Sequence, residues 1–406
     1  MTTTSHALRL DTAPGVNTSS RLPLQWMTGF FFAFRFCLTL VGFQSNPRAG
    51  TVVNLACSGL LLAATLIYTI GGERVSTVRL RNIRTLWWLA AYILITGMSL
   101  LWTGAESTAV AAGYWAAMVS DVVTVLLFLK TPNLMQQADV LMKGFVIGML
   151  VVSAAAWMSP TLPDLRIGNE EFLHPNTVGL YTALGFFLAQ HLALESRGWR
   201  WCCLALGITL LRSISKTSIV AFMIAESFYL LREKQLSRWM KIKIAMVAAV
   251  VIAAFGTLLE AYFAIYTTTG NQAETLTGRT VIWTTSFFMA LETPWLGHGL
   301  YSYRALIPAF GTFQPWHAHD ELLQQFFEVG AVGVAITVGL YLSLFLAAKR
   351  HSTSRYGKLG MVAVLFCIMR GTTDTLNFGL SLPLWLFAVL AVALAQPGDA
   401  REVIPS

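Results

Sequence analysis

Charged side chains are scarce in this sequence. They make up 12% of its 406 residues, against 55% for hydrophobic residues, whereas soluble globular domains average about 25% charged residues. The few charges are also unbalanced, with 28 Lys and Arg against 20 Asp and Glu, which gives a net charge of +8. No basic patch is combined with a soluble domain, so we expect no nucleic-acid partner. The composition therefore predicts a polytopic membrane protein.

The cysteines and the absence of an internal repeat narrow the kind of membrane protein that this chain can be. The five cysteines lie in apolar runs without metal-ligand spacing, so neither a disulfide nor a zinc site is predicted. No internal repeat is evident, whereas many transporters consist of two matching halves with interrupted helices. Polar chemistry is instead concentrated in two segments, 158–174 and 265–328. This asymmetry argues against a transporter and favours an enzyme at the membrane surface.

Apolar runs long enough to cross a membrane fill most of the chain. A hydrocarbon core of about 30 Å needs about 20 helical residues. Nine runs meet this requirement: 24–44, 50–70, 85–102, 108–129, 140–157, 175–194, 244–264, 329–348 and 382–396. Three shorter runs, 201–213, 217–231 and 359–370, are expected to be tilted, broken or re-entrant. The predicted fold is all-α, a single membrane domain over residues 1–406 with about twelve spans.

Basic residues orient this predicted bundle. Short loops rich in Lys and Arg stay on the cytoplasmic side of a membrane, and four such segments fall on one side if every span is real. They are 71–84, 195–201, 232–243 and 349–358. The tails 1–22 and 397–406 are then cytoplasmic, and the long polar segment 265–328 is external.

The external segment 265–328 contains the predicted catalytic centre. Loops of this length are usually functional or disordered, and this one is too rich in Trp, Phe, Tyr and Leu to be disordered. Near its end lies the quartet 317–320, His-Ala-His-Asp, preceded by Trp316. Such a setting can tune an imidazole for general-base catalysis near neutral pH.

Two readings of the histidine pair stay open. Residues two apart in an extended stretch point the same way, so His317 and His319 are expected to face one pocket. A metal site with two histidines is the competing interpretation, but the sequence offers no clear third ligand at helical spacing. We therefore predict no metal and no other cofactor.

Cations on the external side suggest an anionic ligand. The positive-inside rule should deplete Lys and Arg there, and guanidinium groups match phosphate oxygens in a bidentate fork. A lipid diphosphate fits such a cluster. The alternative is that individual cations pair with Asp121, Glu260, Glu292 or Asp374 or contact lipid head groups. The residues concerned are Arg35, Arg48, Lys143, Arg166, Arg212, Lys216, Arg279, Arg304 and Arg370.

Five motifs carry a resemblance to a known family. In chain order they are 174–176 (His-Pro-Asn), 215–218 (Ser-Lys-Thr-Ser), 276–283 (Leu-Thr-Gly-Arg-Thr-Val-Ile-Trp), 294–299 (Pro-Trp-Leu-Gly-His-Gly), and 317–320 with Gly330 and Gly333. Their order and their position between late spans resemble the O-antigen ligase and Wzy-type polysaccharide polymerase superfamily. The string 276–283 is closest to exopolysaccharide polymerases.

The resemblance implies a metal-independent, inverting, GT-C-like glycosyltransferase of the bacterial inner membrane. Such enzymes take a glycan from an undecaprenyl diphosphate carrier on the periplasmic side and transfer it to an acceptor hydroxyl. The family's catalytic histidine is followed by Asn, Ser or Gln, nine residues, and then Gly-x-x-Gly. This pattern assigns the base to His319, with Asp320 as a departure that is expected to hold the imidazole or raise its pKa.

Substrate-binding residues follow from the same resemblance. The essential arginines of the family map onto Arg279 and Arg166. The other residues predicted to bind diphosphate or glycan are Lys216, His317, Asp320, Asn176 and Arg304.

The reaction itself stays open between two members of the superfamily. A polymerase joins carrier-linked repeat units, whereas a ligase moves the finished lipopolysaccharide glycan onto lipid A-core. The motifs favour the polymerase. A polysaccharide or lipid exporter is a further alternative from another class, since it would also be polytopic and basic. Expected partners are the carrier-linked donor, the glycan or lipid A-core acceptor, membrane lipids and other polysaccharide assembly proteins.

Overall fold

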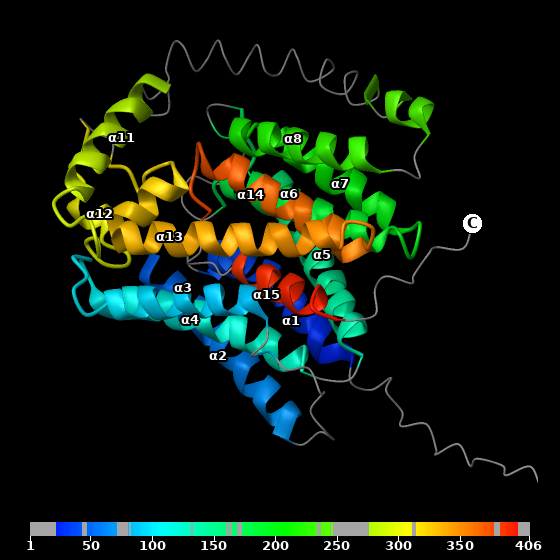
Figure 1. Cartoon of the computed structure of the whole chain (residues 1–406), viewed down its shortest axis with the longest axis horizontal. Helices are drawn as coiled ribbons and strands as arrows, with labels where there is room; N and C mark the ends of the chain where they lie inside the picture. Colours follow the sequence, from blue (N-terminus) through cyan, green and yellow to red (C-terminus); the bar gives the residue numbers. More distant parts are fainter. Residues whose placement is uncertain are drawn as a thin grey trace, which may run out of the picture.

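The chain folds into a bundle of helices. The computed structural model describes residues 22–42, 47–70, 80, 83–130, 133–159, 162, 165–168, 173–233, 237–243, 245–246, 276–310, 314–376 and 382–396. Within this part of the chain the secondary structure is helical, and the helices pack side by side (Figure 1). Four segments are long and apolar enough to cross a membrane: Val52–Ile70, Thr108–Phe128, Leu134–Met158 and Glu321–Arg350. These findings confirm an all-α membrane protein.

Most of the described helices coincide with predicted apolar runs, and two others lie within the predicted external segment 265–328. The first eight are α1 (Leu22–Gly42), α2 (Pro47–Ile70), α3 (Arg84–Ser99), α4 (Thr108–Phe128), α5 (Leu134–Met158), α6 (Pro175–Leu192), α7 (Trp199–Arg212) and α8 (Lys216–Arg232). The others are α11 (Leu276–Ala290), α12 (Tyr303–Leu306), α13 (Glu321–Arg350), α14 (Arg355–Gly371) and α15 (Leu384–Ala393). The predicted span 244–264, both tails and the beginning of the segment 265–328 lie almost entirely outside the described residues.

Glycines bring α1 and α5 into backbone contact. A Cβ on Gly29 of α1 would lie 1.9 Å from the Leu141 carbonyl oxygen, and one on Gly144 of α5 would lie 2.0 Å from the Trp26 carbonyl oxygen. Small residues at helix interfaces allow this approach in membranes, where close packing replaces the hydrophobic effect as the driving force. The α1–α5 pair therefore forms a tight part of the scaffold.

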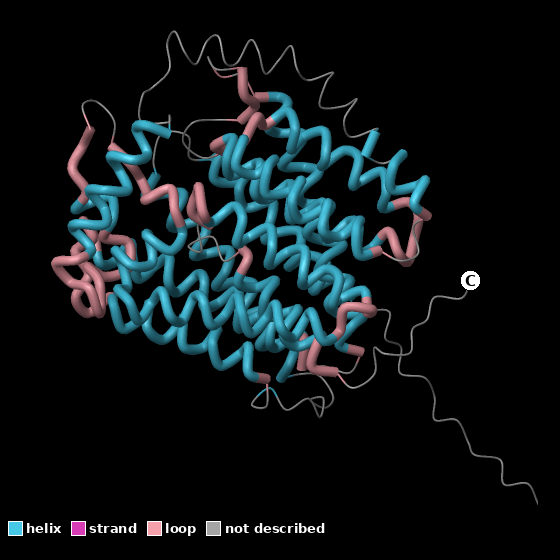
Figure 2. The backbone as a smooth tube through the Cα atoms, turned by 45° about the horizontal axis from the view of Figure 1, so that its top comes forward, coloured by secondary structure: helices cyan, strands magenta, loops and turns pink. Residues whose placement is uncertain are grey.

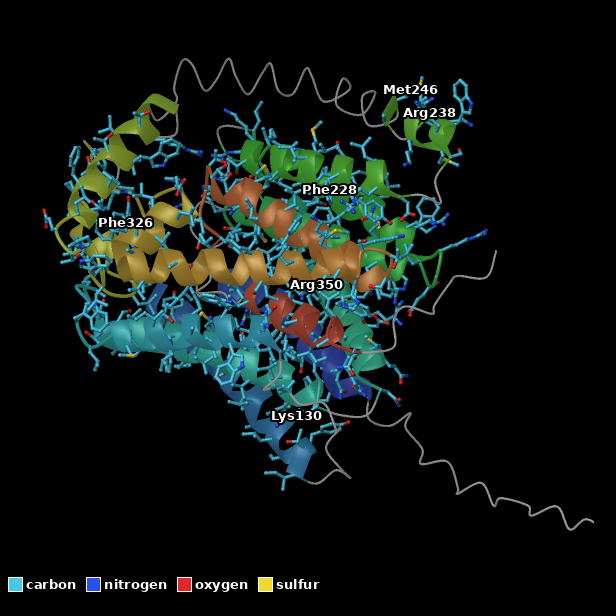
Figure 3. The ribbon with its side chains drawn as sticks, in the orientation of Figure 1. Lys130, Phe228, Arg238, Met246, Phe326 and Arg350 are labelled. Atoms are coloured by element: carbon cyan, nitrogen blue, oxygen red, sulfur yellow. The ribbon has the colours of Figure 1, made fainter. Side chains whose placement is uncertain are left out.

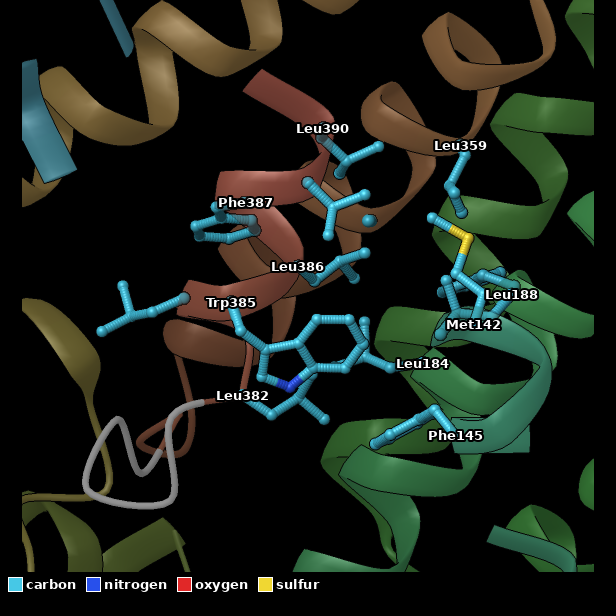
Figure 4. Packing of buried hydrophobic residues seen from close by; sticks show 14 of the residues in the cluster. Met142, Phe145, Leu184, Leu188, Leu359, Leu382, Trp385, Leu386, Phe387 and Leu390 are labelled. Carbon is cyan, nitrogen blue, oxygen red and sulfur yellow. The ribbon is translucent and has the colours of Figure 1, made fainter. Parts of the chain in front are cut away.

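The last helix is a core element rather than a membrane span. The run 382–396 was predicted to cross the membrane, but α15 has only 10 residues, about 15 Å of helix. None of its residues is more than 2% exposed. Figure 4 shows Trp385 and Leu386 of α15 packed among residues of α5, α6 and α14. The apolar composition therefore reflects burial in protein, which a sequence pattern cannot distinguish from burial in lipid.

Helix α13 is interrupted at Gly330, and the break is filled by the loop 294–299. Gly330 has φ 70° and ψ −166°, and a Cβ there would lie 2.3 Å from the carbonyl carbon and oxygen of Trp295. The backbone N–H of His298 donates to the Phe327 carbonyl (2.9 Å), and that of Ala331 donates to the Pro294 carbonyl (2.8 Å). The two motifs 294–299 and Gly330 thus form one structural unit that stabilises the start of α13.

The two ends of the bundle differ in character. Figure 3 shows Phe326 at one end and Arg350 towards the other. At the Arg350 end, Glu195 lies between Arg355 (2.5 Å) and Lys143 (3.7 Å). Lys143 was among the cations that the predicted topology did not assign to the cytoplasm, and this ion pair places it at the end that the basic loops do assign to the cytoplasm. Its position in α5, two turns inside the helix, made its side ambiguous from sequence.

Some of the predicted external cations have carboxylate partners. Arg35 of α1 is buried and binds Asp121 of α4 at 2.6 Å. Arg370 binds Asp374 at 2.8 Å, with both side chains 2% exposed. For these two arginines the pairing interpretation is correct, because an unpaired charge inside a membrane protein is costly.

Candidate active site

The candidate site forms where α13 begins and α14 ends. These two helices are antiparallel neighbours, joined at the opposite end of the bundle by the short turn 351–354. The segments 314–320 and 372–376 therefore meet at one end, near α11 and α12 (Figure 1). Loops gather at the same end (Figure 2).

His317 and His319 lie side by side. Their ring centroids are 4.3 Å apart, and the backbone N–H of His319 donates to Nδ1 of His317 (3.3 Å). His319 adopts φ 53°, a left-handed conformation that is uncommon outside glycine. Gln324 of α13 holds the segment through its Oε1, which accepts from the backbone N–H of Ala318 (2.7 Å). The two rings share one site, as their spacing predicted.

Asp374 approaches both histidines from the end of α14. Its Oδ1 lies 3.4 Å from Nδ1 of His319 and 3.8 Å from Nδ1 of His317. Burial acts to raise the pKa of Asp374, but the Arg370 guanidinium and the two imidazoles outweigh it and hold the pKa well below its usual range. Asp374 is thus a buried carboxylate that stays ionised beside His319.

All three guanidinium nitrogens of Arg370 make hydrogen bonds within the protein. Besides the ion pair, its Nε donates to the Ser218 hydroxyl of α8 (3.1 Å), and its Nη2 donates to the carbonyl of Asn176 in α6 (3.4 Å). Its Nη1 donates to the carbonyl of Thr375. Arg370 therefore ties together three helices and the Asp374 loop rather than presenting a cation to a ligand.

Glu321 fixes the same loop from the other side. Its Oε2 accepts from the backbone N–H of Leu376 (2.9 Å), while its Oε1 accepts from Gln325 Nε2 (3.0 Å). Glu321 is the first residue of α13 and directly follows the histidine segment. One helix start therefore positions both the histidines and the carboxylate.

The protein environment keeps His317 neutral. Burial, followed by the neighbouring His319 ring, lowers the pKa of His317 to about 3. Its Nδ1 accepts a backbone hydrogen bond, which places any ring proton on Nε2. His317 is thus an uncharged acceptor that supports the His319 backbone.

The same three side chains could in principle ligate a metal. His317, His319 and Asp374 offer ligand atoms that all lie within 4.8 Å of one another, so the structure provides the third ligand that the sequence did not reveal. Arg370, however, binds the other oxygen of Asp374 at 2.8 Å. A guanidinium at this distance disfavours a second cation on that carboxylate. The arrangement fits an imidazole held beside an ionised carboxylate better than a metal centre.

Asp320 has a structural role that was not predicted. It is the N-cap of α13, and its Oδ1 accepts from the backbone N–H of Leu323 (2.8 Å). The carboxylate beside both rings is that of Asp374, so the prediction that Asp320 holds the imidazole or raises its pKa stays a prediction. Asn, Ser and Asp are all favoured N-caps. This preference explains why Asp320 can replace the Asn or Ser that the resemblance expects.

Three of the predicted binding residues surround the Asp374 loop. Arg279, near the start of α11, donates from Nη1 to the Thr373 carbonyl (2.7 Å). Lys216 begins α8 with its side chain exposed, two residues before Ser218. Asn176 lies at the start of α6, where its carbonyl accepts from Arg370. The starts of α6, α8 and α11 thus converge on the site.

The remaining candidates lie in other settings. Arg166 is 7% exposed in the loop before α6, so its assignment to the diphosphate stays a prediction. Arg304 of α12 stacks on Trp316, with its guanidinium carbon 3.6 Å from the ring centroid. His298 is structural, since its Nε2 lies 3.0 Å from the Met289 carbonyl and its ring packs on Phe327.

An aromatic groove leads away from the site between α11 and α13. It has a volume of about 510 Å³ and is lined by Trp283, Thr284, Phe287, Phe288, Asp320 and Leu323. Phe287 and Phe288 are 47% and 64% exposed. Asp320 is next to His319 in the chain, so the groove begins beside the base.

The prediction from sequence missed the pairing of Asp374 with His319. Arg370 and Asp374 are four residues apart at the end of a helix, and this i,i+4 spacing of opposite charges is the available signal. Their contact with His319 depends on how α13 and α14 pack.

Comparison with known proteins shows what the chain is similar to. A family model described as O-antigen ligase matches residues 201–338. The exopolysaccharide production protein ExoQ of Rhizobium meliloti (strain 1021) is 25% identical over 344 residues, which cover 78% of this chain and 76% of the relative. These similarities confirm the predicted resemblance to the O-antigen ligase and Wzy-type superfamily. The family match includes His319, Arg279 and Lys216 but not Asp374.

Proposed function

We propose that this protein is a membrane-integral, metal-independent inverting glycosyltransferase. It transfers a glycan from an undecaprenyl diphosphate carrier to an acceptor sugar hydroxyl on the periplasmic face of the bacterial inner membrane. The observation that carries the proposal is the His319–Asp374 pair, with 3.4 Å between Nδ1 and Oδ1, at an end of the bundle that also presents Arg279 and Lys216.

The pair supplies a general base. An ionised carboxylate beside Nδ1 favours the tautomer with its proton there, which leaves Nε2 free to accept a proton. The acceptor hydroxyl oxygen forms a bond to the anomeric carbon, its proton passes to Nε2 of His319, and the bond from the anomeric carbon to the diphosphate oxygen breaks. The bonding electrons leave with the diphosphate. Arg279, Lys216 and Arg166 neutralise the developing charge.

The groove between α11 and α13 fits the lipid part of such a donor. Arg279, Trp283 and Phe287 follow one another at four-residue intervals along α11, so a cation and two aromatic rings lie on one helix face. An anionic head group with a long hydrocarbon chain matches this order. The polyprenyl chain then lies along Phe287 and Phe288 while the diphosphate lies near Arg279.

Polymerisation of repeat units of a surface polysaccharide or exopolysaccharide is the favoured reaction. The similarity to a protein described as an exopolysaccharide production protein supports it. The family model described as O-antigen ligase keeps transfer to lipid A-core as the second candidate. Both reactions use the same donor site and base.

A reconstitution assay tests the proposal. Purified protein is incubated with the carrier-linked repeat unit in the presence of EDTA and without nucleotide sugar, and products are separated by length. We expect lengthening by the wild type and none by His319→Ala that elutes as a folded, monodisperse protein. Transfer to added lipid A-core alone would identify a ligase. Movement of the carrier across vesicles without a new glycosidic bond would identify an exporter instead.

A further inference from the structure

A rigid, exposed tryptophan lies next to the histidine pair. Trp316 directly precedes His317 and is 54% exposed, although Arg304 covers part of its ring at 3.6 Å. An exposed indole of a membrane protein contacts water, the lipid interface or a ligand. A well-held exposed aromatic ring beside a reactive centre is a typical feature of a ligand site.

Several contacts hold this ring in place. Gln314 Nε2 donates to the carbonyls of Arg304 (3.0 Å) and Ile307 (2.8 Å), which joins the segment before Trp316 to α12. Tyr303 of α12 is buried, and its hydroxyl is 2.7 Å from Ser286 Oγ of α11. The Arg304–Trp316 stack is therefore anchored to the bundle rather than to a free loop.

The ring is within reach of the reacting atoms. Three residues of extended chain span at most about 11 Å, so the backbone of Trp316 lies within this distance of His319. A sugar ring whose hydroxyl touches His319 therefore lies near the part of the chain that carries the indole.

The Trp316 stack and the aromatic groove occupy different sides of α11. Trp283, Thr284, Phe287 and Phe288 line the groove, whereas the buried Ser286 faces α12. At about 3.6 residues per turn these two sets lie on different faces of the helix. The lipid chain of the proposed donor thus follows the groove face of α11. It leaves the exposed ring of Trp316 free to contact a sugar.

We propose that Trp316, positioned by Arg304, is a stacking platform for a pyranose ring of the acceptor glycan. This inference rests on the proposed glycosyl transfer. Aliphatic C–H groups on one face of a pyranose are apolar and pack on an aromatic ring, while its hydroxyls stay hydrogen-bonded. A membrane anchor at the lipid interface is the alternative role for an exposed tryptophan, and the test below separates it from binding of the acceptor glycan.

Binding of carrier-free oligosaccharide tests the platform. Repeat-unit oligosaccharide released from its carrier by mild acid contains neither lipid nor diphosphate. We expect Trp316→Ala to bind it about tenfold more weakly than the wild type, and Trp316→Phe to restore most of the affinity. Arg304→Ala should weaken binding severalfold, with partial recovery in Arg304→Lys. In the transfer assay, Trp316→Ala should raise the acceptor KM and leave kcat nearly unchanged.

Trp295→Ala is the matched control. Trp295 is 72% exposed at the same end of the molecule, but it is not next to the histidines. Equal affinity of wild type and Trp316→Ala, or equal losses in Trp316→Ala and Trp295→Ala, overturns the inference. A loss seen only with the lipid-linked form overturns it in favour of a membrane contact. Because binding is measured without turnover, a wild type that binds oligosaccharide but transfers nothing contradicts only the proposed function.

Discussion

The carboxylate of Asp374 lies 3.4 Å from Nδ1 of His319. In the hairpin formed by α13 and α14, His319 precedes the first helix and Asp374 follows the second. Arg370 binds the other carboxylate oxygen at 2.8 Å. This order of guanidinium, carboxylate and imidazole places an ionised carboxylate beside His319. Most of the predictions below follow from this arrangement and from the helix start that supports it.

Replacing Asp374 by Asn should greatly reduce the rate of transfer. The amide keeps the size of the side chain but removes the charge that orients and stabilises the imidazole, so we expect kcat to fall about a hundredfold or more. Single-turnover assays with the carrier-linked repeat unit measure this change. Asp320→Asn is the matched control. If the two variants have similar kcat values, the loss is not specific to Asp374, and neither carboxylate can be assigned the role of orienting the His319 imidazole.

Asp320 should matter for stability more than for catalysis. Asp320→Asn and Asp320→Ser keep an N-cap and should resemble the wild type, whereas Asp320→Ala should lose about 1 kcal/mol of stability. Thermal unfolding in detergent, combined with kcat at a temperature where every variant is folded, separates the two effects. A large fall in kcat for Asp320→Asn would show that Asp320 acts on the imidazole after all.

Gly330→Ala should destabilise the start of α13. A Cβ at φ 70° would lie 2.3 Å from backbone atoms of Trp295, so we expect a loss of at least about 1 kcal/mol and disturbance of the docked loop 294–299. Gly59 of α2 is the control, because a Cβ there meets nothing within 4 Å. Thermal unfolding of the two alanine variants should differ clearly, with Gly59→Ala at or above the wild type.

Acidification should destabilise the protein through His317. Its pKa in the folded protein is lowered to about 3, whereas an unfolded histidine titrates near about 6.5. The unfolded state therefore binds a proton first as the pH falls, and stability is lost below about 6.5. The depressed pKa of Asp374 adds a loss in the same direction, but only below about pH 4.

His317→Asn isolates this effect, since the amide oxygen can still accept from the His319 backbone. Between pH 7 and pH 4.5 the melting temperature of this variant should fall less than that of the wild type. Parallel curves for the two proteins would show that His317 titrates normally in the fold.

The groove should make the enzyme sensitive to the length of the carrier chain. Phe287→Ala removes an aromatic side chain whose burial against hydrocarbon is worth about 2 kcal/mol, so KM for a long-chain donor should rise at least tenfold. A short farnesyl-type donor should show little change. Trp201→Ala is the control, because Trp201 is 74% exposed on α7. An equal effect of Phe287→Ala on the long and the short donor would mean that the polyprenyl chain does not bind along Phe287.

Most helix positions could be predicted from the sequence, because a membrane-spanning helix needs an apolar run of about 20 residues. The runs 50–70 and 108–129 became α2 and α4 within a few residues. Among the described residues, the run 382–396 differs, because its core became the buried α15. Apolar composition reports exclusion from water, and it cannot tell whether lipid or protein provides the exclusion.

Within the candidate site, local spacing was informative and long-range pairing was not. The interval of two residues correctly brought His317 and His319 together. The same local view assigned Asp320 to the imidazole, because it is the nearest carboxylate in the chain. Asp374 lies beside the rings only because Glu321 and Arg370 fix the loop after α14 against the start of α13.

The sequence by itself determined a helical membrane protein and a polar segment with paired histidines. These properties depend on composition and on contacts between near neighbours. Only the tertiary structure decided that Asp374 lies beside His319, that Asp320 caps a helix, and that Arg304 stacks on Trp316. Those contacts join separate segments, and their geometry arises from the packing of helices that no local pattern specifies.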